Sequence, residues 1–428
     1  MAVIGETPSR TRGTGLSAKA LRCAVLAGVA VLLTFARGPM LAVVAMETWS
    51  DRIVNYGVLC ITPLAVLYWL LSRADSRYFL LMSPFMVLTG WVCICVLAIG
   101  PKEYWPDRGA LVTIFAGAAL ASQVAPGELR QMRYALLVIT AAFNAMLLTR
   151  VPELLAQLHE ASGEVRIGAD VSPANVVALP RAYFTLALIC VATVLLERRL
   201  WLRGLALALS IVPLGLGLGA GSRGPTLAFA VALTVFLLGV RRHIGTRQAG
   251  IVVAALVLVG YALTMRGELL AKTRLFVDDT ERGALYALVI EDIMRGLSLV
   301  GRGPGATYAH NLFLEFLQDY GICGLAFCLV FLSFSLGALW RCYRVTHDVE
   351  VAWLGGVIVL QLVAQQFSLN IYTGSFWTAL LMPIGLAWWQ GRPAHRATRP
   401  FRRKDAQSTG EQASARRGRR RAWETPSD

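Results

Sequence analysis

Charged residues are scarce in this sequence, and long stretches of it contain none. Only 16% of the 428 residues are charged, whereas 56% are hydrophobic, and the mean hydropathy is +0.58. A typical soluble domain carries about 25% charged residues. The composition therefore excludes an ordinary soluble domain and favours a chain whose apolar surface is covered by lipid.

Motifs for nucleotides and metals are also lacking. The sequence has no GxxxxGK[ST] phosphate loop, no GxGxxG dinucleotide motif in a soluble unit, and no HExxH zinc motif. Its eight cysteines lie within or beside apolar runs, without the spacing of a metal site or a disulfide framework. Asp278 and Asp279 are adjacent loop acids, which rarely suffice to bind a divalent ion. We therefore expect no metal and no cofactor.

The period-two alternation of membrane β-strands is absent, whereas long apolar runs recur. Runs of about 16 to 22 residues are long enough to cross a bilayer as helices. We count twelve of them, at roughly 21–45, 55–72, 78–99, 109–125, 134–149, 182–197, 203–219, 224–240, 249–265, 321–340, 350–370 and 374–390. The sequence therefore predicts an all-α polytopic membrane protein with about twelve transmembrane helices and one larger outer loop.

This pattern divides the chain into five parts. We expect a disordered N-terminus (1–20), helices one to nine (21–265), an outer loop (266–320), helices ten to twelve (321–390) and a basic disordered tail (391–428). No cleavage pattern followed by a soluble domain accompanies the first run, so we expect it to be retained as a membrane helix.

The distribution of basic residues predicts the orientation. With twelve crossings, 27 Lys and Arg residues lie on the side of the termini and 13 on the other side, with Arg37 inside the first run. The positive-inside rule then places both termini in the cytoplasm. The net charge is +15, but the basic residues lie in short loops and the tail, so we expect membrane lipids and not nucleic acid as partners.

The most informative stretch is 301–324. Its opening, Gly301-Arg302-Gly303-Pro304-Gly305, predicts a turn that cannot be helical. A short helix is predicted to begin near His310, and another membrane segment at Gly321.

The short helix has two different faces. Asn311, Glu315 and Asp319 are spaced i, i+4 and i+8, so they share one side. An apolar side is formed by Phe313, Phe316, Leu317 and Tyr320. The polar side is either the wall of an active site or simply the side that faces water beside a membrane.

Three outer arginines stand in unusual settings. Arg223 lies in Ser222-Arg223-Gly224-Pro225 between two membrane runs, Arg282 lies in the large outer loop, and Arg302 lies in the glycine turn. A guanidinium binds phosphate oxygens in a forked geometry. Taken singly, each is explained as a solvated loop charge. Taken together, they would suit a lipid-linked diphosphate, with His310 accepting a proton from an attacking hydroxyl.

These residues resemble the signature of the O-antigen ligase and O-antigen polymerase superfamily over roughly residues 205–370. The resemblance rests on His310-Asn311-x-x-Leu314-Glu315, on Gly321 and Gly324 after it, and on Gly301-x-Gly303-Pro304-Gly305 before it. Ser222-Arg223-Gly224 is similar to the family's arginine between two central helices. Arg282 is followed by Tyr286 where the family more often has tryptophan, and Arg302 replaces an apolar residue.

The resemblance implies a GT-C-like, metal-independent, inverting glycosyltransferase of the bacterial inner membrane. The donor would be an undecaprenyl-diphosphate-linked oligosaccharide used on the periplasmic side. Arg223 and Arg282 would hold the diphosphate, and His310 would act as the base or orient the acceptor. Arg302, Asn311 and Glu315 would support the site, and partners would include other polysaccharide assembly and export proteins.

Three alternatives remain open beside a polymerase of exported polysaccharide. A ligase that transfers the glycan to lipid A-core shares the same motifs, although the modest outer loops favour a polymerase. A protein O-oligosaccharyltransferase is disfavoured because no sizeable soluble domain is present. A transporter or flippase would place ionisable residues near the bilayer midplane, yet only Arg37 lies well inside an apolar run.

Overall fold

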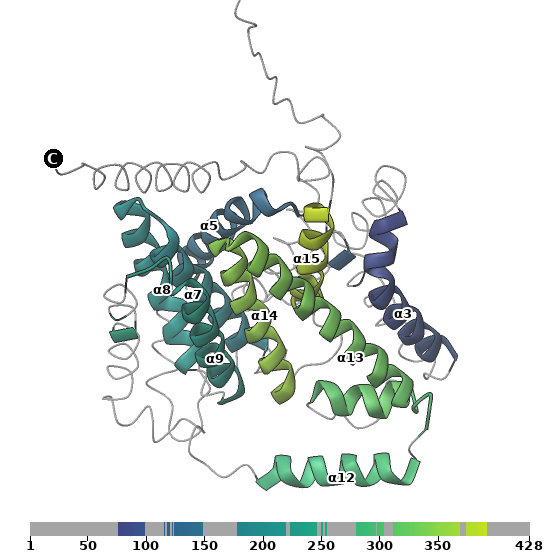
Figure 1. The fold of residues 1–428 in the computed structure, drawn as a ribbon. Helices are drawn as coiled ribbons and strands as arrows, with labels where there is room; N and C mark the ends of the chain where they lie inside the picture. The colour runs from purple at the N-terminus through teal and green to yellow at the C-terminus, as the bar shows by residue number, and fades with distance from the viewer. Residues whose placement is uncertain are drawn as a thin grey trace, which may run out of the picture. The chain divides into compact units, whose positions relative to one another are not determined.

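The computed structural model describes residues 76–98, 115–148, 178–219, 223–245, 250–254, 280–303, 311–368 and 374–391, apart from gaps at 116–117, 120–121, 123, 251–252 and 297. Within these ranges every regular element is a helix, and no strand is present. The elements are α3 (Ser76–Ala98), η2 (Pro126–Glu128), α5 (Leu129–Leu148), α7 (Ala178–Leu196), α8 (Leu200–Gly219), α9 (Arg223–Val240), α12 (Thr280–Gly296), α13 (Leu312–Thr346), α14 (Val349–Ser368) and α15 (Gly374–Gly391) (Figure 1).

Four of the described helices are long and apolar enough to cross a membrane. They are Ser76–Val96, Leu200–Leu218, Leu312–Thr346 and Val349–Phe367, and Pro180–Leu196 and Gly224–Val240 are shorter apolar helices. The prediction of an all-α membrane protein is confirmed at this level. The predicted runs 21–45 and 55–72 lie outside the described residues, as do most of 109–125 and 249–265, so the number twelve stays a prediction.

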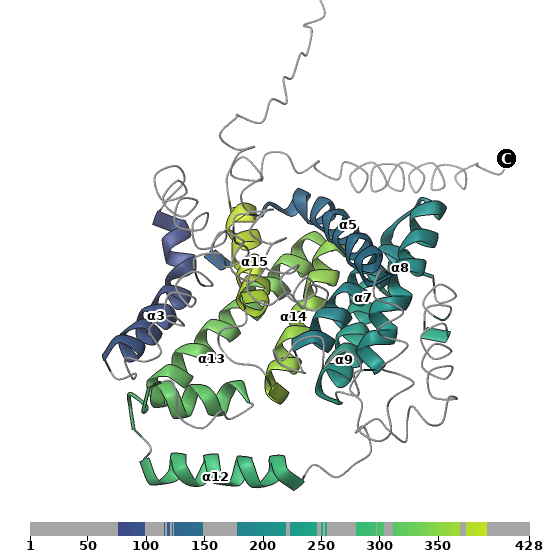
Figure 2. The same ribbon diagram turned by 180° about the vertical axis from the view of Figure 1, so that it is seen from behind.

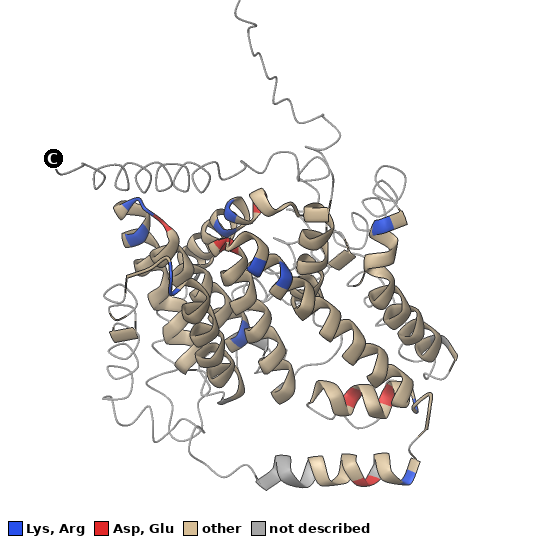
Figure 3. Ribbon diagram, viewed as in Figure 1, with Lys and Arg blue, Asp and Glu red and all other residues tan. Residues whose placement is uncertain are grey.

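Charge separates the apolar helices from α12. Lys, Arg, Asp and Glu of the apolar helices lie near the helix ends, and the middle stretches carry none (Figure 3). The shorter α12 carries five charged residues, two in its first turn and three in its last turns, where Arg295 pairs with Glu291 one turn earlier. The sequence predicted the outer loop 266–320 without this helix. Its 17 residues and its charges keep α12 out of the set of candidate spans.

Helix α14 is more buried than the other three described helices that are long enough to cross a membrane. Within the apolar stretch of each helix, 72% is buried inside the protein in α14, compared with 33% in α3 and 28% in α8 and in α13. Small residues allow α9 to pack closely against it: a Cβ on Gly356 would lie 3.1 Å from the Phe236 Cβ, and Ala228 packs against Ala364. Figures 1 and 2 show α9 and α14 side by side from both directions.

Helix α13 is interrupted near its start. Gly321 has φ 70° and ψ −170°, which separates a short segment, Leu312–Tyr320, from a long one beginning at Ile322. The bend is visible in Figure 1. It falls at the residue where the sequence predicts that a membrane segment begins.

The chain divides into residues 1–387 and 388–428. The second unit is described only over the last residues of α15, where the rings of Trp388 and Trp389 meet edge to face with centroids 5.2 Å apart. The predicted basic tail lies outside the described residues.

Candidate functional site

The glycine turn is joined to the break in α13 by four backbone hydrogen bonds. The Arg302 N–H donates to the Gln318 carbonyl and the Gly303 N–H to the Asp319 carbonyl, each at 3.0 Å. In return, the Ile322 and Cys323 N–H groups donate to the carbonyls of Ser298 and Leu299, at 3.1 and 3.2 Å. The first N–H groups of a helix have no partner within it, so the turn satisfies two donors that the break leaves open.

Side chains are excluded where the turn meets the break. Gly301 and Gly321 have φ of 79° and 70°, which L-residues rarely adopt. A Cβ on Gly301 would lie 2.5 Å from the Asp319 carbonyl oxygen, and one on Gly321 would lie 2.5 Å from the Leu299 carbonyl oxygen. The glycines of the family-like signature are therefore required by close backbone contact at this point.

Asn311 caps α13 and ties it to α14. Its side-chain oxygen accepts hydrogen bonds from the N–H groups of Phe313 and Leu314, at 3.0 and 3.2 Å. Its Nδ2 donates to the Gln366 carbonyl at 3.3 Å. Asn311 therefore serves as an N-cap and an anchor, and does not belong to the polar side that we predicted it to share with Glu315.

The polar side of the short segment is buried. Glu315, Gln318 and Asp319 are 6%, 4% and 8% exposed. The water-facing alternative for this helix is therefore wrong for Glu315 and Asp319. Nearby, the Trp91 indole N–H of α3 donates to the Tyr320 carbonyl at 3.0 Å, which fixes the end of the segment against α3.

The first turn of α9 contacts the last turn of α14. A Cβ on Gly224 would lie 2.6 Å from the Phe367 Cγ, so only a hydrogen fits there. Arg223, the residue before Gly224, begins α9, and the structure gives its backbone position only. The last turn of α14 is thus contacted by the start of α9, next to Arg223, and by the N-cap residue of α13.

The residues that follow the two predicted functional positions therefore contact neighbouring residues of α14. Gln366 binds Asn311, which directly follows His310, and Phe367 contacts Gly224, which directly follows Arg223. His310 itself lies outside the described residues. The N-termini of α9 and α13 meet the same end of α14, and helix N-termini carry partial positive charge that favours anions.

Helix α12 runs in the same direction as the short segment of α13. Its Val289 and Ile293 pack against Leu314 and Leu317, and its C-terminal Gly296 lies against the side chain of Arg302 beside the break. Arg282, described by its backbone only, precedes Val289 by two turns, about 10 Å. The N-terminal end of α12, with Arg282, therefore points to the end of the segment at which Asn311 lies.

Arg302 is placed differently from the other two arginines. It is exposed, and it lies in the turn beside the break of α13, at the end of the short segment away from Asn311. The structure therefore does not bring Arg302 to the end of α14 that receives Asn311 and Gly224.

Sequence reasoning missed Gln365. This residue of α14 is 0% exposed, and within the described part of the chain neither its amide oxygen nor its amide nitrogen has a hydrogen-bond partner. By contrast, Gln361 donates to the Thr185 hydroxyl at 3.0 Å and accepts from Ser375 at 3.2 Å. The sequence could have indicated this residue, because one apolar run contains three glutamines, at 361, 365 and 366. A buried amide without a partner is costly, so glutamines in such a run point to specific contacts.

Within the described ranges no group of three His, Cys, Asp or Glu side chains is arranged to hold a metal ion. Asp278, Asp279 and the remaining outer loop lie outside those ranges. No family model matches the chain, and no curated protein matches it.

Proposed function

We propose that this chain is a bacterial inner-membrane glycosyltransferase that polymerises undecaprenyl-diphosphate-linked oligosaccharide repeat units on the periplasmic side. One observation carries the proposal: the residues that follow Arg223 and His310 contact Phe367 and Gln366 of α14. The two residues are far apart in the sequence, yet the fold brings their neighbours to consecutive positions. This proximity supports a site in which a diphosphate-binding arginine acts together with a nearby base.

The proposal includes twelve crossings, cytoplasmic termini and a periplasmic loop 266–320. In support, α7, α8, α9, α14 and α15 each coincide with a predicted run. Their few charges lie at helix ends, as crossing helices require. The charged helix α12 falls within the loop that we assign to the periplasm.

The reaction joins two lipid-linked glycans. The acceptor hydroxyl oxygen attacks the anomeric carbon of the donor sugar, and the bond from that carbon to the diphosphate oxygen breaks with its electron pair, inverting the configuration. His310 accepts the hydroxyl proton. Arg223, Arg282 and the N-termini of α9 and α13 stabilise the charge that develops on the leaving undecaprenyl diphosphate.

The remaining candidates would act indirectly. Asn311 would position His310, because it fixes the start of α13 through its cap and its bond to α14. Glu315, buried one turn later, would hold the same segment. Gln365 would bind a hydroxyl or amide of the glycan, which would satisfy its buried amide.

A deletion strain tests the proposed function. We expect single lipid-linked repeat units to accumulate and the long polymer to disappear, both restored by the wild-type gene. Accumulation of long lipid-linked polymer that never reaches lipid A-core would instead establish the ligase alternative. Unchanged intermediates and unchanged polymer would contradict both.

Variants then test the site in the same strain. Arg223→Ala and Arg282→Ala should abolish polymer while the protein still inserts, and lysine should restore it only in part. Arg295→Ala, on the same helix as Arg282, is the matched control, because Arg295 pairs only with exposed Glu291 in the described chain. Wild-type amounts of polymer from both alanine variants would show that these arginines are solvated loop charges.

The base is tested by turnover on lipid-linked donor in detergent. His310→Ala should reduce turnover by about 10²- to 10⁴-fold while donor binding is retained. His159→Ala, in the other outer loop and outside the described residues, should be near normal. Full activity of His310→Gln would show that His310 does not act as the base.

A further inference from the structure

A groove of about 600 Å³ lies between α5 and α8. It begins where α5 and α8 begin, beside the first turn of α14, which is the opposite end of α14 from Gln366. Its volume lies within the range of about 300–1,000 Å³ that is usual for small-molecule sites. None of the residues assigned to the proposed reaction lines it.

The wall formed by α5 changes from charged to apolar along one side of the helix. Arg130, Tyr134, Leu137, Val138 and Ala141 follow one another at helical spacing and all line the groove. The distance from the first to the last is about 16 Å along the axis. That is about half of the hydrocarbon thickness of a bilayer, roughly 30 Å.

The wall formed by α8 changes in the same order. Arg199 precedes the helix, Trp201 stands at its first turn, and Leu202, Leu205 and Leu209 line the groove further along. Trp201 is 64% exposed and Leu205 is 43% exposed. Tryptophan at the border of a charged and an apolar zone is typical of a membrane interface.

The floor and the far end of the groove are closed by protein. Leu137, Cys190 and Ala206 form a buried cluster in which α7 lies behind α5 and α8. At the far end, Asn144 Nδ2 donates to the Leu209 carbonyl at 2.9 Å. The groove is therefore a bounded cleft of the protein.

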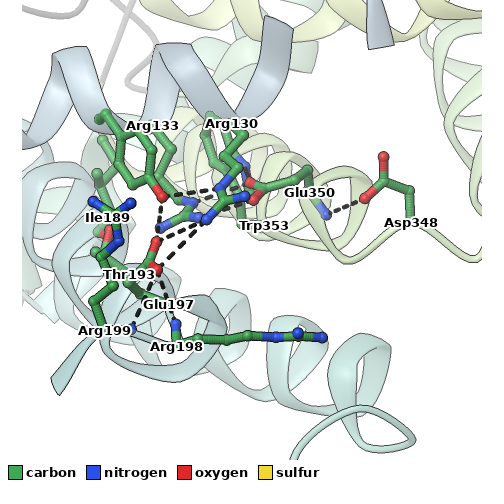
Figure 4. Close-up of polar contacts among 11 residues, drawn as sticks. Arg130, Arg133, Ile189, Thr193, Glu197, Arg198, Arg199, Asp348, Glu350 and Trp353 are labelled. Carbon is green, nitrogen blue, oxygen red and sulfur yellow. Dashed lines mark hydrogen bonds and ion pairs between the residues drawn. The ribbon is translucent and has the colours of Figure 1, made fainter. Parts of the chain in front are cut away.

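The guanidinium of Arg130, at the mouth, is held by neighbouring groups (Figure 4). Arg130 donates to the Tyr134 hydroxyl at 2.9 Å and to Glu197 Oε2 at 3.2 Å, and the Tyr134 hydroxyl donates to the same carboxylate. Glu197 is buried and also accepts hydrogen bonds from the N–H groups of Arg198 and Arg199, at 2.9 and 3.3 Å. The Arg199 guanidinium has no hydrogen-bond partner within the described residues, so it is available to an anion.

The mouth has a net positive charge. Arg130, Arg198 and Arg199 are exposed there, and Arg203 follows one turn into α8. The acids on the same elements are Glu197, which faces these arginines, and Glu128, whose carboxylate accepts from the Ala125 N–H at 2.9 Å. The mouth therefore favours an occupant that presents an anion there.

We propose that this groove binds an anionic phospholipid. Its phosphate lies at Arg130 and Arg199, where guanidinium groups bind phosphate oxygens. One acyl chain lies along the leucines of α8 and the apolar residues of α5, whose combined length matches one leaflet. The bound lipid thereby covers exposed apolar side chains such as Val138, which is 68% exposed.

Equilibrium binding of fluorescent phosphatidylglycerol and phosphatidylcholine with identical chains, to the purified full-length protein in detergent, tests this. We expect phosphatidylglycerol to bind about tenfold more tightly, because both lipids offer a phosphate to the arginines but the positive charge of the mouth opposes the choline cation of phosphatidylcholine. Arg199→Gln should reduce that preference about threefold to tenfold. Arg241→Gln, at the end of α9, is the matched control and should retain it.

A second variant tests the acyl site separately. Ala141→Trp fills the apolar part of the groove and should weaken both lipids equally, while Arg199→Gln should weaken phosphatidylglycerol more than phosphatidylcholine. Equal binding of the two lipids by the wild-type protein, or an unchanged preference in Arg199→Gln, would overturn the proposal. Displacement of phosphatidylglycerol by equimolar glycerol phosphate would show a free-phosphate site and would also overturn it.

Discussion

Adding one methyl group at Gly321 should separate the glycine turn from α13. In Gly321→Ala the new Cβ would lie 2.5 Å from the Leu299 carbonyl oxygen and 2.6 Å from its carbonyl carbon. Both atoms belong to backbone, so no side-chain rotation relieves the overlap. The residue also keeps φ 70° and ψ −170°, a conformation that is essentially restricted to glycine.

The expected cost combines two effects of the structure. Holding alanine in this backbone conformation costs about 1–3 kcal/mol. Moving the turn away to relieve the overlap breaks at least the bonds from Ile322 and Cys323 to Ser298 and Leu299, worth about 1 kcal/mol each. The free energy of unfolding should therefore fall by roughly 3–5 kcal/mol, or the turn should detach locally and polymer synthesis should stop.

Unfolding of the purified protein in an SDS titration measures the stability, and polymer in the complemented deletion strain measures the activity. Gly337→Ala is the matched control on α13, because its added Cβ meets nothing within 4 Å and alanine in a helix interior is favoured by about 0.5–1 kcal/mol. Gly301→Ala should behave like Gly321→Ala, and the double variant should be less than additive. Equal stability and activity of Gly321→Ala and Gly337→Ala would refute the reasoning.

Three further predictions follow from the structure and the resemblance. Arg133 Nη2 and Glu350 Oε1 form a buried pair at 2.8 Å. Arg133→Met or Glu350→Met should therefore each lower the free energy of unfolding by about 3–5 kcal/mol, and the double variant should recover most of that loss. Additive losses in SDS titrations would contradict this. Burial opposes ionisation of Glu197, but hydrogen bonds from Tyr134, Arg130 and two backbone N–H groups outweigh it and lower the pKa of Glu197 from 4.5 to about 2. Its contribution to stability is therefore complete above about pH 4.5 and is lost as the pH falls toward 2, so Glu197→Gln should flatten the acid side of the stability profile, and an unchanged profile would count against the network. Purified enzyme should keep its turnover in excess EDTA, as a metal-independent transfer implies; loss restored by magnesium or manganese would disprove it.

Local features of the fold were predictable from the sequence. Glycine and proline between 219 and 225 mark the division between α8, which ends at Gly219, and α9, which begins at Arg223. The non-helical turn at 301–303 and the break at Gly321 follow in the same way, because glycine imposes them within a few residues. These features need no knowledge of what packs against them.

Features that depend on distant contacts were not predictable. Arg133 was counted with the loop charges that orient the chain, yet it is 0% exposed and is held by Glu350, a residue 217 positions later. The short segment at Leu312 could be assigned a polar side, but not its burial against α3 and α14. Helix α12 was missed because its charged sequence lacks the long apolar run by which we recognised the other helices.

The spacing between the start of α9 and the start of α13 depends on how closely α9 and α14 approach. Arg223 begins α9, and α14 carries the carbonyl that binds Asn311, so the distance between Arg223 and Asn311 depends on the packing of α9 on α14. Glycine and alanine line that contact at Gly224, Ala228 and Gly356, where a Cβ on either glycine would meet Phe367 or Phe236 within 3.1 Å. A larger residue at any of these positions would push α9 outward and move Arg223 without touching a reacting group. The small residues of α9 and α14 are therefore as necessary for positioning the proposed site as the charged residues are for its chemistry.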